Sequence, residues 1–270
     1  MQGAKNLVER GRRRAFFLSS FVGVAWLVLL LPSTAGADRR AYGETYEAVT
    51  APQGELDVEI WNTYAEDGEV LNGPASKGYR GMLELEYGIT SRWDVALYNF
   101  LDLVPDPGET GYAGFKIESR FRLVPAGEWF VDPILYLEYV RQFRGDTQQK
   151  WEVKLILGKD IGPWNVSTNV AFELERAIGA KYIPEVEYDL GISREVFGPA
   201  LKVGAEIFGK AEKPPGEDDW EVFAWAGPAI SWATSIRGVM RGFWITLAGG
   251  KGLTNQSKAY YGRAIIGLQF

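Results

Sequence analysis

The chain contains neither cysteine nor histidine. The absence of cysteine excludes disulfides and thiolate chemistry. The absence of histidine removes the commonest general base and the commonest transition-metal ligand. We therefore expect a protein that is not an enzyme and that holds neither a cofactor nor a metal ion.

Two acidic groups offer alternatives to this expectation. Glu84 and Glu86 lie on the same face of one predicted strand, where a pair of carboxylates could act as general acid and general base. Lining a lumen is the simpler role for two residues at this spacing. The run Glu217-Asp218-Asp219 supplies oxygen ligands for weak contact with Ca²⁺ or Mg²⁺, or it is a solvated loop.

Beyond residue 37 the chain also lacks an apolar run long enough for a membrane-spanning helix. Residues 1–14 are basic, residues 15–31 are apolar, and the small-residue motif Ala35-Gly36-Ala37 follows. This order predicts a signal peptide over residues 1–37, Sec-type export and cleavage near Ala37. The alternative is an uncleaved inner-membrane anchor. The apolar run of residues 15–31 is only just long enough to cross a bilayer.

Positive charge is scarce once the predicted signal peptide is removed. Residues 1–37 hold five basic residues and one acidic residue, so the remainder has 24 Lys and Arg against 34 Asp and Glu, a formal charge of −10. This balance argues against nucleic acid as a partner, and it would favour cations in a pore.

Apolar and polar residues alternate through most of the remaining chain. Leu56, Val58 and Ile60 alternate with acidic residues, which is the period of a strand with two different faces. Twelve such segments lie near residues 54–64, 83–89, 92–101, 112–123, 130–142, 150–157, 164–175, 182–193, 200–208, 220–232, 241–248 and 260–270. Lipid cannot satisfy the hydrogen-bonding groups of an open sheet edge, so a sheet that spans a membrane must close on itself. We therefore predict an all-β fold: a closed, antiparallel, up-and-down transmembrane β-barrel of about twelve strands over residues 54–270. Residues 38–53 show no period and are predicted to form a periplasmic lead-in.

The connections and the aromatic residues favour the bacterial outer membrane, with its lipid as a partner. Brief connections such as Thr90-Ser91 alternate with longer ones such as residues 65–78. Aromatic residues lie near predicted strand ends, at the level of lipid headgroups: Tyr112, Trp129, Trp151, Trp164, Tyr182, Trp220 and Tyr260. In a soluble all-β protein, which is the alternative, such rings would belong to the core.

The last predicted strand ends on an aromatic residue. Its outer face carries Ala264, Ile266, Leu268 and Phe270. This pattern resembles the C-terminal signal that the barrel-assembly machinery reads in outer-membrane barrels, so this machinery is the expected partner during biogenesis. The signal often carries glycine five residues before the end, where this chain has Ile265.

Charged residues occupy the other face of several strands. A charge facing lipid at the midplane costs about 2 to 4 kcal/mol for Lys or Arg, so these faces are predicted to line the lumen. The acidic lining is Glu55, Asp57, Glu59, Glu84, Glu86, Glu173, Glu185, Glu187 and Asp189, and the basic lining is Lys116, Arg120, Arg122 and Arg263. Separate acidic and basic walls would set a transverse field across a pore. Alternatively, these side chains pair and plug the lumen.

Three segments carry a resemblance to a known family. Residues 86–95, 116–123 and 158–166 resemble the hairpins of small proteobacterial outer-membrane barrels that are described as transporters, some linked to the phenol meta-pathway. The resemblance implies the barrel fold and a transport function, and it assigns no binding residue. We expect a passive pore or uptake channel for a small solute, with a net acidic lumen. The alternative is a non-conducting barrel with a structural role or with surface interactions through its external loops.

Overall fold

The computed structural model describes residues 40–66, 78–103, 110–143, 147–177, 180–214, 219–236, 238–257 and 259–270. The predicted signal peptide, residues 1–37, lies outside them, as do Glu217 and Asp218 of the acidic run. Among the residues described, no helix is both long and apolar enough to cross a membrane.

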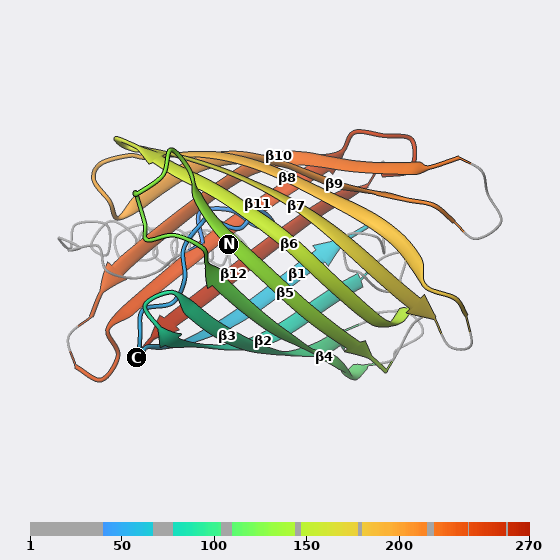
Figure 1. Ribbon diagram of the computed structural model, residues 1–270, viewed down its shortest axis with the longest axis horizontal. Helices are drawn as coiled ribbons and strands as arrows, with labels where there is room; N and C mark the ends of the chain where they lie inside the picture. The colour runs from blue at the N-terminus through green and yellow to red at the C-terminus, as the bar shows by residue number, and fades with distance from the viewer. Residues whose placement is uncertain are drawn as a thin grey trace, which may run out of the picture. The chain divides into compact units, whose positions relative to one another are not determined.

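Twelve antiparallel strands form the regular structure of these residues (Figure 1). They are β1 (Leu56–Ala65), β2 (Gly78–Thr90), β3 (Trp93–Leu103), β4 (Thr110–Arg122), β5 (Asp132–Gln142), β6 (Thr147–Ile161), β7 (Trp164–Ala177), β8 (Ile183–Glu195), β9 (Leu201–Glu212), β10 (Glu221–Ser235), β11 (Gly242–Gly252) and β12 (Tyr260–Gln269). Each strand pairs with the next, and β12 returns to pair with β1 from Asp57 opposite Gln269 to Ala65 opposite Tyr261. The predicted closed barrel of twelve up-and-down strands is therefore confirmed.

The two faces of the wall follow the period of two. On β2, Leu83 and Leu85 are 38% and 39% exposed, whereas Glu84 and Glu86 are 0% and 3% exposed. An apolar outer surface around a polar interior is what a transmembrane barrel requires. The seven aromatic residues predicted at strand ends are all exposed, between 42% and 55%, so they do not form a soluble core.

The two ends of the barrel differ in their connections. At one end, which we call the short-turn end, β2 and β3 are joined through Ser91 and Arg92, and β6 and β7 through Gly162 and Pro163. Gly162 has a φ of 60°, which favours glycine in this tight turn. The connection between β4 and β5, for which the sequence predicts a brief turn at Val124-Pro125-Ala126-Gly127, is longer and runs over residues 123–131. The opposite end, where residues 66–77 join β1 to β2, is called the long-loop end.

The described part of the predicted periplasmic lead-in lies inside the barrel. We call residues 40–52 the inner segment (blue in Figure 1). Tyr42 donates to Asn165 at 2.9 Å, and the backbone N–H of Ala51 donates to Asp94 at 2.8 Å, and both partners are inward-facing wall residues. The segment has no strand period because its backbone is satisfied by side chains of the lumen rather than by a neighbouring strand.

Glycines in the wall make room for the inner segment. A Cβ atom on Gly191 of β8 would lie 2.7 Å from the ring of Tyr42, and one on Gly158 of β6 would lie 2.7 Å from the Cβ of Ala48. Real Cβ atoms do not approach neighbours so closely, so these two positions let the segment lie directly against the wall. The inner segment and the wall therefore fit one another in shape.

Candidate functional site

One carboxylate in the lumen holds three consecutive backbone groups of the inner segment. Glu206 on β9 accepts hydrogen bonds from the N–H groups of Gly43, Glu44 and Thr45 at 2.9, 3.0 and 2.9 Å, and from the Thr45 hydroxyl at 3.1 Å. Hydrogen bonds to a charged acceptor are stronger than neutral ones. Glu206 is 3% exposed, so these bonds are shielded from water. This carboxylate is the main anchor of the inner segment.

Side chains from other strands complete the anchoring. Asn169 on β7 pairs with the backbone of Tyr46 in both directions, accepting its N–H at 2.7 Å and donating to its carbonyl at 3.0 Å. Arg122 on β4 donates to the carbonyl of Ala48 at 2.9 Å. Arg263 on β12 donates to the carbonyl of Gly43 at 2.8 Å. The segment is thus held from several sides of the lumen.

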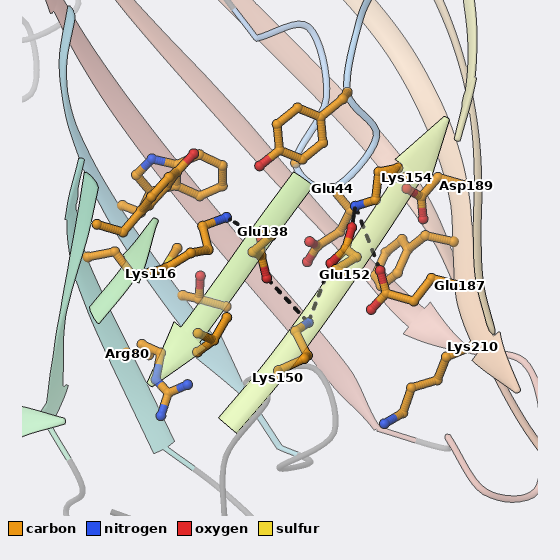
Figure 2. A pocket seen from close by; sticks show the side chains of 18 of the residues that line it. Glu44, Arg80, Lys116, Glu138, Lys150, Glu152, Lys154, Glu187, Asp189 and Lys210 are labelled. Carbon is orange, nitrogen blue, oxygen red and sulfur yellow. Dashed lines mark ion pairs between the residues drawn. The ribbon is translucent and has the colours of Figure 1, made fainter. Parts of the chain in front are cut away.

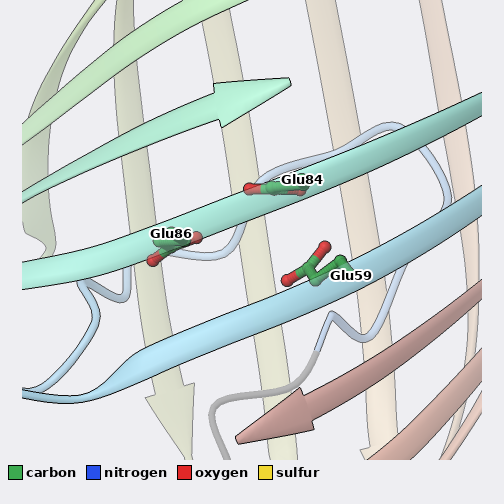
Figure 3. A group of neighbouring side chains, drawn as sticks. All are labelled: Glu59, Glu84 and Glu86. Atoms are coloured by element: carbon green, nitrogen blue, oxygen red, sulfur yellow. The ribbon is translucent and has the colours of Figure 1, made fainter. Parts of the chain in front are cut away.

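Arg40 contacts the acidic group of β1 and β2. Its guanidinium donates to Glu59 at 3.0 Å and to Glu84 at 3.2 Å, and it lies 4.0 Å from Glu86 (Figure 3 shows the three carboxylates). Oxygens of these carboxylates lie within 4.8 Å of one another, as in an oxygen-ligand metal site. The indole N–H of Trp61 also donates to both Glu59 and Glu84 at 3.0 Å. Because the guanidinium groups of Arg40 and Arg120 already pair with these carboxylates, we assign the group no metal.

A cavity remains between the inner segment and the long-loop end. Its volume is about 160 Å³, and Gly43, Glu44 and Tyr46 of the inner segment form one side of it. The other lining residues lie on the wall, including Arg80, Gln142 and Lys210 near the long-loop ends of β2, β5 and β9. The inner segment therefore closes the cavity toward the short-turn end.

Alternating charges run along one side of this cavity. Successive ion pairs join Lys116 to Glu138 at 3.0 Å, Glu138 to Lys150 at 3.6 Å, and Lys150 to Glu152 at 3.6 Å. They continue from Glu152 to Lys154 at 2.9 Å and from Lys154 to Glu187 at 3.7 Å. We call these six residues, drawn in Figure 2, the ion-pair chain. Since each member has an opposite charge beside it, the chain carries donors and acceptors in alternation and little net charge.

Aromatic rings line other parts of the cavity. Phe208 and Trp225 stack with ring centroids 5.5 Å apart and planes at 16°. Trp61 and Tyr98 meet edge to face at 6.3 Å. All four residues line the cavity and are at least nine-tenths buried. We call them the ring group. The cavity thus combines aromatic surface with a row of paired charges.

The structure places the predicted lumen residues inside the barrel, with one exception. Asp57, Glu59, Glu84, Glu86, Glu173, Glu185, Asp189, Arg120 and Arg122 are buried, and Glu187, Lys116 and Arg263 are mostly buried and face inward. Glu55 precedes β1 at the short-turn end, where it pairs with Arg241 at 3.0 Å and accepts from Gln269 at 2.7 Å. Its place near the end of the barrel follows from the register of β1 with β12.

The predicted separate acidic and basic walls are not what the structure shows. Arg120 lies between Asp94, at 2.9 Å, and Glu86, to which it also donates a hydrogen bond. Lys116 pairs with Glu118 of its own strand at 3.2 Å. Neighbouring strands interleave opposite charges because adjacent inward positions come close together across the ladder. Acidic and basic side chains therefore do not form separate walls in the described part of the lumen.

Several important residues were not predicted from the sequence. These are Arg40, Arg80, Asp94, Glu138, Lys150, Glu152, Lys154, Glu206 and Lys210. The alternation Lys150, Glu152, Lys154 in β6 was a usable signal, since apolar residues separate these charges. Nothing in the local sequence marks Arg40 as a lumen residue.

Comparisons with known proteins identify the fold. The chain matches no protein-family model and no curated protein sequence. Among solved structures, it is similar to one titled "KdgM porin", with a TM-score of 0.52, 8% identity, and coverage of 79% of this chain and 98% of that one. It is also similar to NanC porin, with a TM-score of 0.51, 10% identity, and coverage of 79% and 98%. At these identities the likeness concerns the fold, which is that of a porin-like β-barrel.

Proposed function

We propose that this protein is an outer-membrane channel that admits a small solute from its long-loop end, and that the inner segment plugs the short-turn end. The observation that supports this proposal best is the 160 Å³ cavity inside a closed barrel with a charged interior. The cavity joins aromatic rings with many fixed polar groups, and polar groups that converge on a concave site are a feature of ligand pockets. The porin-like fold agrees with a channel, although the identity of the solute does not follow from it.

The outer surface supports a place in the outer membrane. Apolar residues such as Leu97 and Val153 are exposed in mid-strand, and exposed aromatic residues lie near strand ends. This is the distribution of a barrel in lipid. Half-buried and buried residues alternate at the end of the chain: the buried ones include Ile265 and Gln269, and the half-buried ones are Ala264, Ile266, Leu268 and Phe270. This alternation suits the proposed recognition by the barrel-assembly machinery. Export through a signal peptide ending near Ala37 is part of the same proposal.

The inner segment also bears on ion selectivity. Among the described residues, thirteen acidic and six basic side chains of the barrel are buried. Arg40 covers three of the acidic ones, so removal of the inner segment would expose an acidic lumen. An acidic pore concentrates cations. We therefore propose that the unplugged barrel conducts cations better than anions.

Single-channel conductance in a planar bilayer tests the channel. The protein without residues 38–52 is compared with the chain that retains them, both refolded and shown to be folded by heat-modifiable gel mobility. We expect small or rare current steps with the inner segment present and larger, cation-preferring steps without it. Replacement of Glu59, Glu84 and Glu86 together by Gln in the shortened chain should reduce the cation preference. A folded, shortened barrel that remains silent would contradict the channel.

That silent outcome would favour a second function, a non-conducting barrel with a structural or surface-binding role. The anchoring of the inner segment by Glu206, Asn169, Arg122 and Arg263 is the observation on its side, because it fills part of the lumen with well-bonded chain. Under this function, conductance would be absent whether or not the segment is present.

A further inference from the structure

We propose that the cavity of the long-loop half binds a neutral sugar of about one ring, held between the ring group and the ion-pair chain. This inference rests on the proposed function and names the class of its solute. It follows from four properties of the cavity: its charge balance, the order of its donors and acceptors, its rings and its size.

The charges that line the cavity nearly cancel. Arg80, Lys116, Lys150, Lys154, Lys210 and Arg263 stand against Glu44, Glu138, Glu152, Glu187 and Asp189. The lining residues themselves therefore favour neither sign of charge strongly, in contrast to the acidic excess of the buried lumen as a whole. A charged solute would also compete with ion pairs such as Lys154 with Glu152, at 2.9 Å, which are mostly shielded from water. The balance favours a neutral solute.

The order of polar groups suits hydroxyls. The ion-pair chain presents ammonium and carboxylate groups in strict alternation from Lys116 to Glu187 (Figure 2). An ammonium only donates hydrogen bonds and a carboxylate only accepts them, whereas a hydroxyl does both. Neighbouring hydroxyls along the edge of a sugar can therefore each donate to a carboxylate and accept from a lysine without displacing either charge. A solute with a single hydroxyl would use only one step of the chain.

The ring group supplies the apolar contact that a sugar ring needs. Trp225 stacks on both Phe208 and Phe223 and is 2% exposed, and Tyr98 is 0% exposed, whereas Phe208 keeps the largest accessible fraction of the four, 7%. We therefore place the contact with the sugar at Phe208. The C–H faces of a sugar ring are apolar, so burying them against aromatic side chains is favourable while the hydroxyls reach polar groups at the edge. The two kinds of cavity surface thus match the two kinds of surface on a sugar.

The size of the cavity sets the length of the sugar. A water molecule takes up about 30 Å³ in the liquid, so 160 Å³ corresponds to about five water molecules. One hexose ring with its hydroxyls displaces a comparable number of waters. The inner segment blocks extension toward the short-turn end, so a longer chain of sugars could continue only toward the long loops.

Equilibrium binding to the refolded full chain, in a detergent without a sugar headgroup, tests the inference. Titration calorimetry would compare methyl glucoside, which is neutral, with glucuronate, glucosamine and phenol. Glucuronate and glucosamine keep the sugar ring and add a negative or a positive charge. Phenol keeps a ring but has only one hydroxyl. We expect saturable binding that is tightest for methyl glucoside. Tighter binding of glucuronate, glucosamine or phenol, or no binding of any probe, would overturn the inference.

Substitutions in the ring group locate the bound sugar. Phe208→Leu removes one stacking ring and should weaken methyl glucoside binding about five-fold, the effect of one aromatic contact. Phe208→Met also removes the ring, with a different side-chain shape, and serves if Phe208→Leu does not fold. The matched control is Phe172→Leu on the lipid-facing side of β7, where the ring is 49% exposed. An unchanged affinity in both folded ring-group variants would overturn the assignment to this cavity.

Binding and conduction can fail separately. A shortened barrel that conducts, together with a full chain that binds none of the probes, would refute the sugar site and leave the channel standing. A barrel that never conducts but binds methyl glucoside would refute the channel and leave a sugar-binding barrel.

Discussion

The carboxylate of Glu206 binds Thr45 twice, through its backbone N–H at 2.9 Å and its hydroxyl at 3.1 Å. Sequence neighbours of Thr45 donate to the same carboxylate, so a single wall residue orders a turn of the inner segment. The conformation of that segment therefore depends on a strand more than 150 residues later in the chain.

Substitution Glu206→Gln should loosen the inner segment while the barrel remains folded. The amide loses the negative charge and turns one acceptor into a donor that faces backbone N–H groups. Because hydrogen bonds to charged groups contribute about 1.5 to 3 kcal/mol, we expect a loss of that order in the free energy of unfolding. Urea titration followed by tryptophan fluorescence measures it, and faster amide exchange at Gly43, Glu44 and Thr45 places the effect. Glu128→Gln in the exposed connection after β4 is the control, and equal effects of the two would contradict the anchoring role.

Arg40→Met should destabilise the barrel and create a site for cations. The substitution leaves Glu59 and Glu84 buried without their guanidinium, which costs about 3 to 5 kcal/mol for a buried pair. Since carboxylate oxygens of this group lie within 4.8 Å of one another, millimolar Ca²⁺ should restore part of the loss. The denaturation midpoint with and without Ca²⁺ measures both effects.

Arg241→Met is the comparison for this prediction. Arg241 pairs with Glu55 at the short-turn end and its side chain is 59% exposed, so the pair should contribute no more than about 1 kcal/mol. A Ca²⁺ response in this variant, or none in Arg40→Met, would show that the acidic group of β1 and β2 is not the site.

Gly191→Ala should push the inner segment off the wall. The new Cβ would lie 2.7 Å from the ring of Tyr42, and overpacking of this kind costs about 1 to 3 kcal/mol. Gly262→Ala on β12 is the matched control, since nothing lies within 4 Å of the Cβ it adds. The denaturation midpoint of Gly191→Ala should be clearly lower than that of Gly262→Ala. Equal midpoints would mean that the position of Tyr42 against β8 contributes little to stability.

Val153→Arg tests the orientation of the barrel in lipid. Val153 lies near the middle of β6, is 51% exposed and faces outward, where arginine should cost about 2 to 4 kcal/mol in a bilayer. Ile161→Arg, at the short-turn end of the same strand, should cost no more than about 1 kcal/mol. Folding into lipid vesicles under urea measures both. Equal and small effects would indicate that the mid-strand surface is in water.

The strands and their faces could be predicted because both depend on residues that are close together in the sequence. Period-two alternation at Leu83, Glu84, Leu85 and Glu86 specifies a strand with one apolar face, and lipid outside requires that face to point outward. The same logic placed Asp57, Glu59 and the acidic residues of β8 inside. These assignments need no knowledge of which strands are neighbours.

The partners inside the lumen could not be predicted in this way. Arg40 meets Glu84 across 44 residues, and Arg263 meets Gly43 across 220, because closure of the barrel brings distant strands around one interior. The inner segment has no period of its own, since lumen side chains rather than a strand satisfy its backbone. The order of residues thus determined a barrel with a charged interior. Only the tertiary structure decided that acidic and basic side chains interleave inside the barrel, that the segment before β1 lies in the short-turn half, and that a cavity remains beyond it.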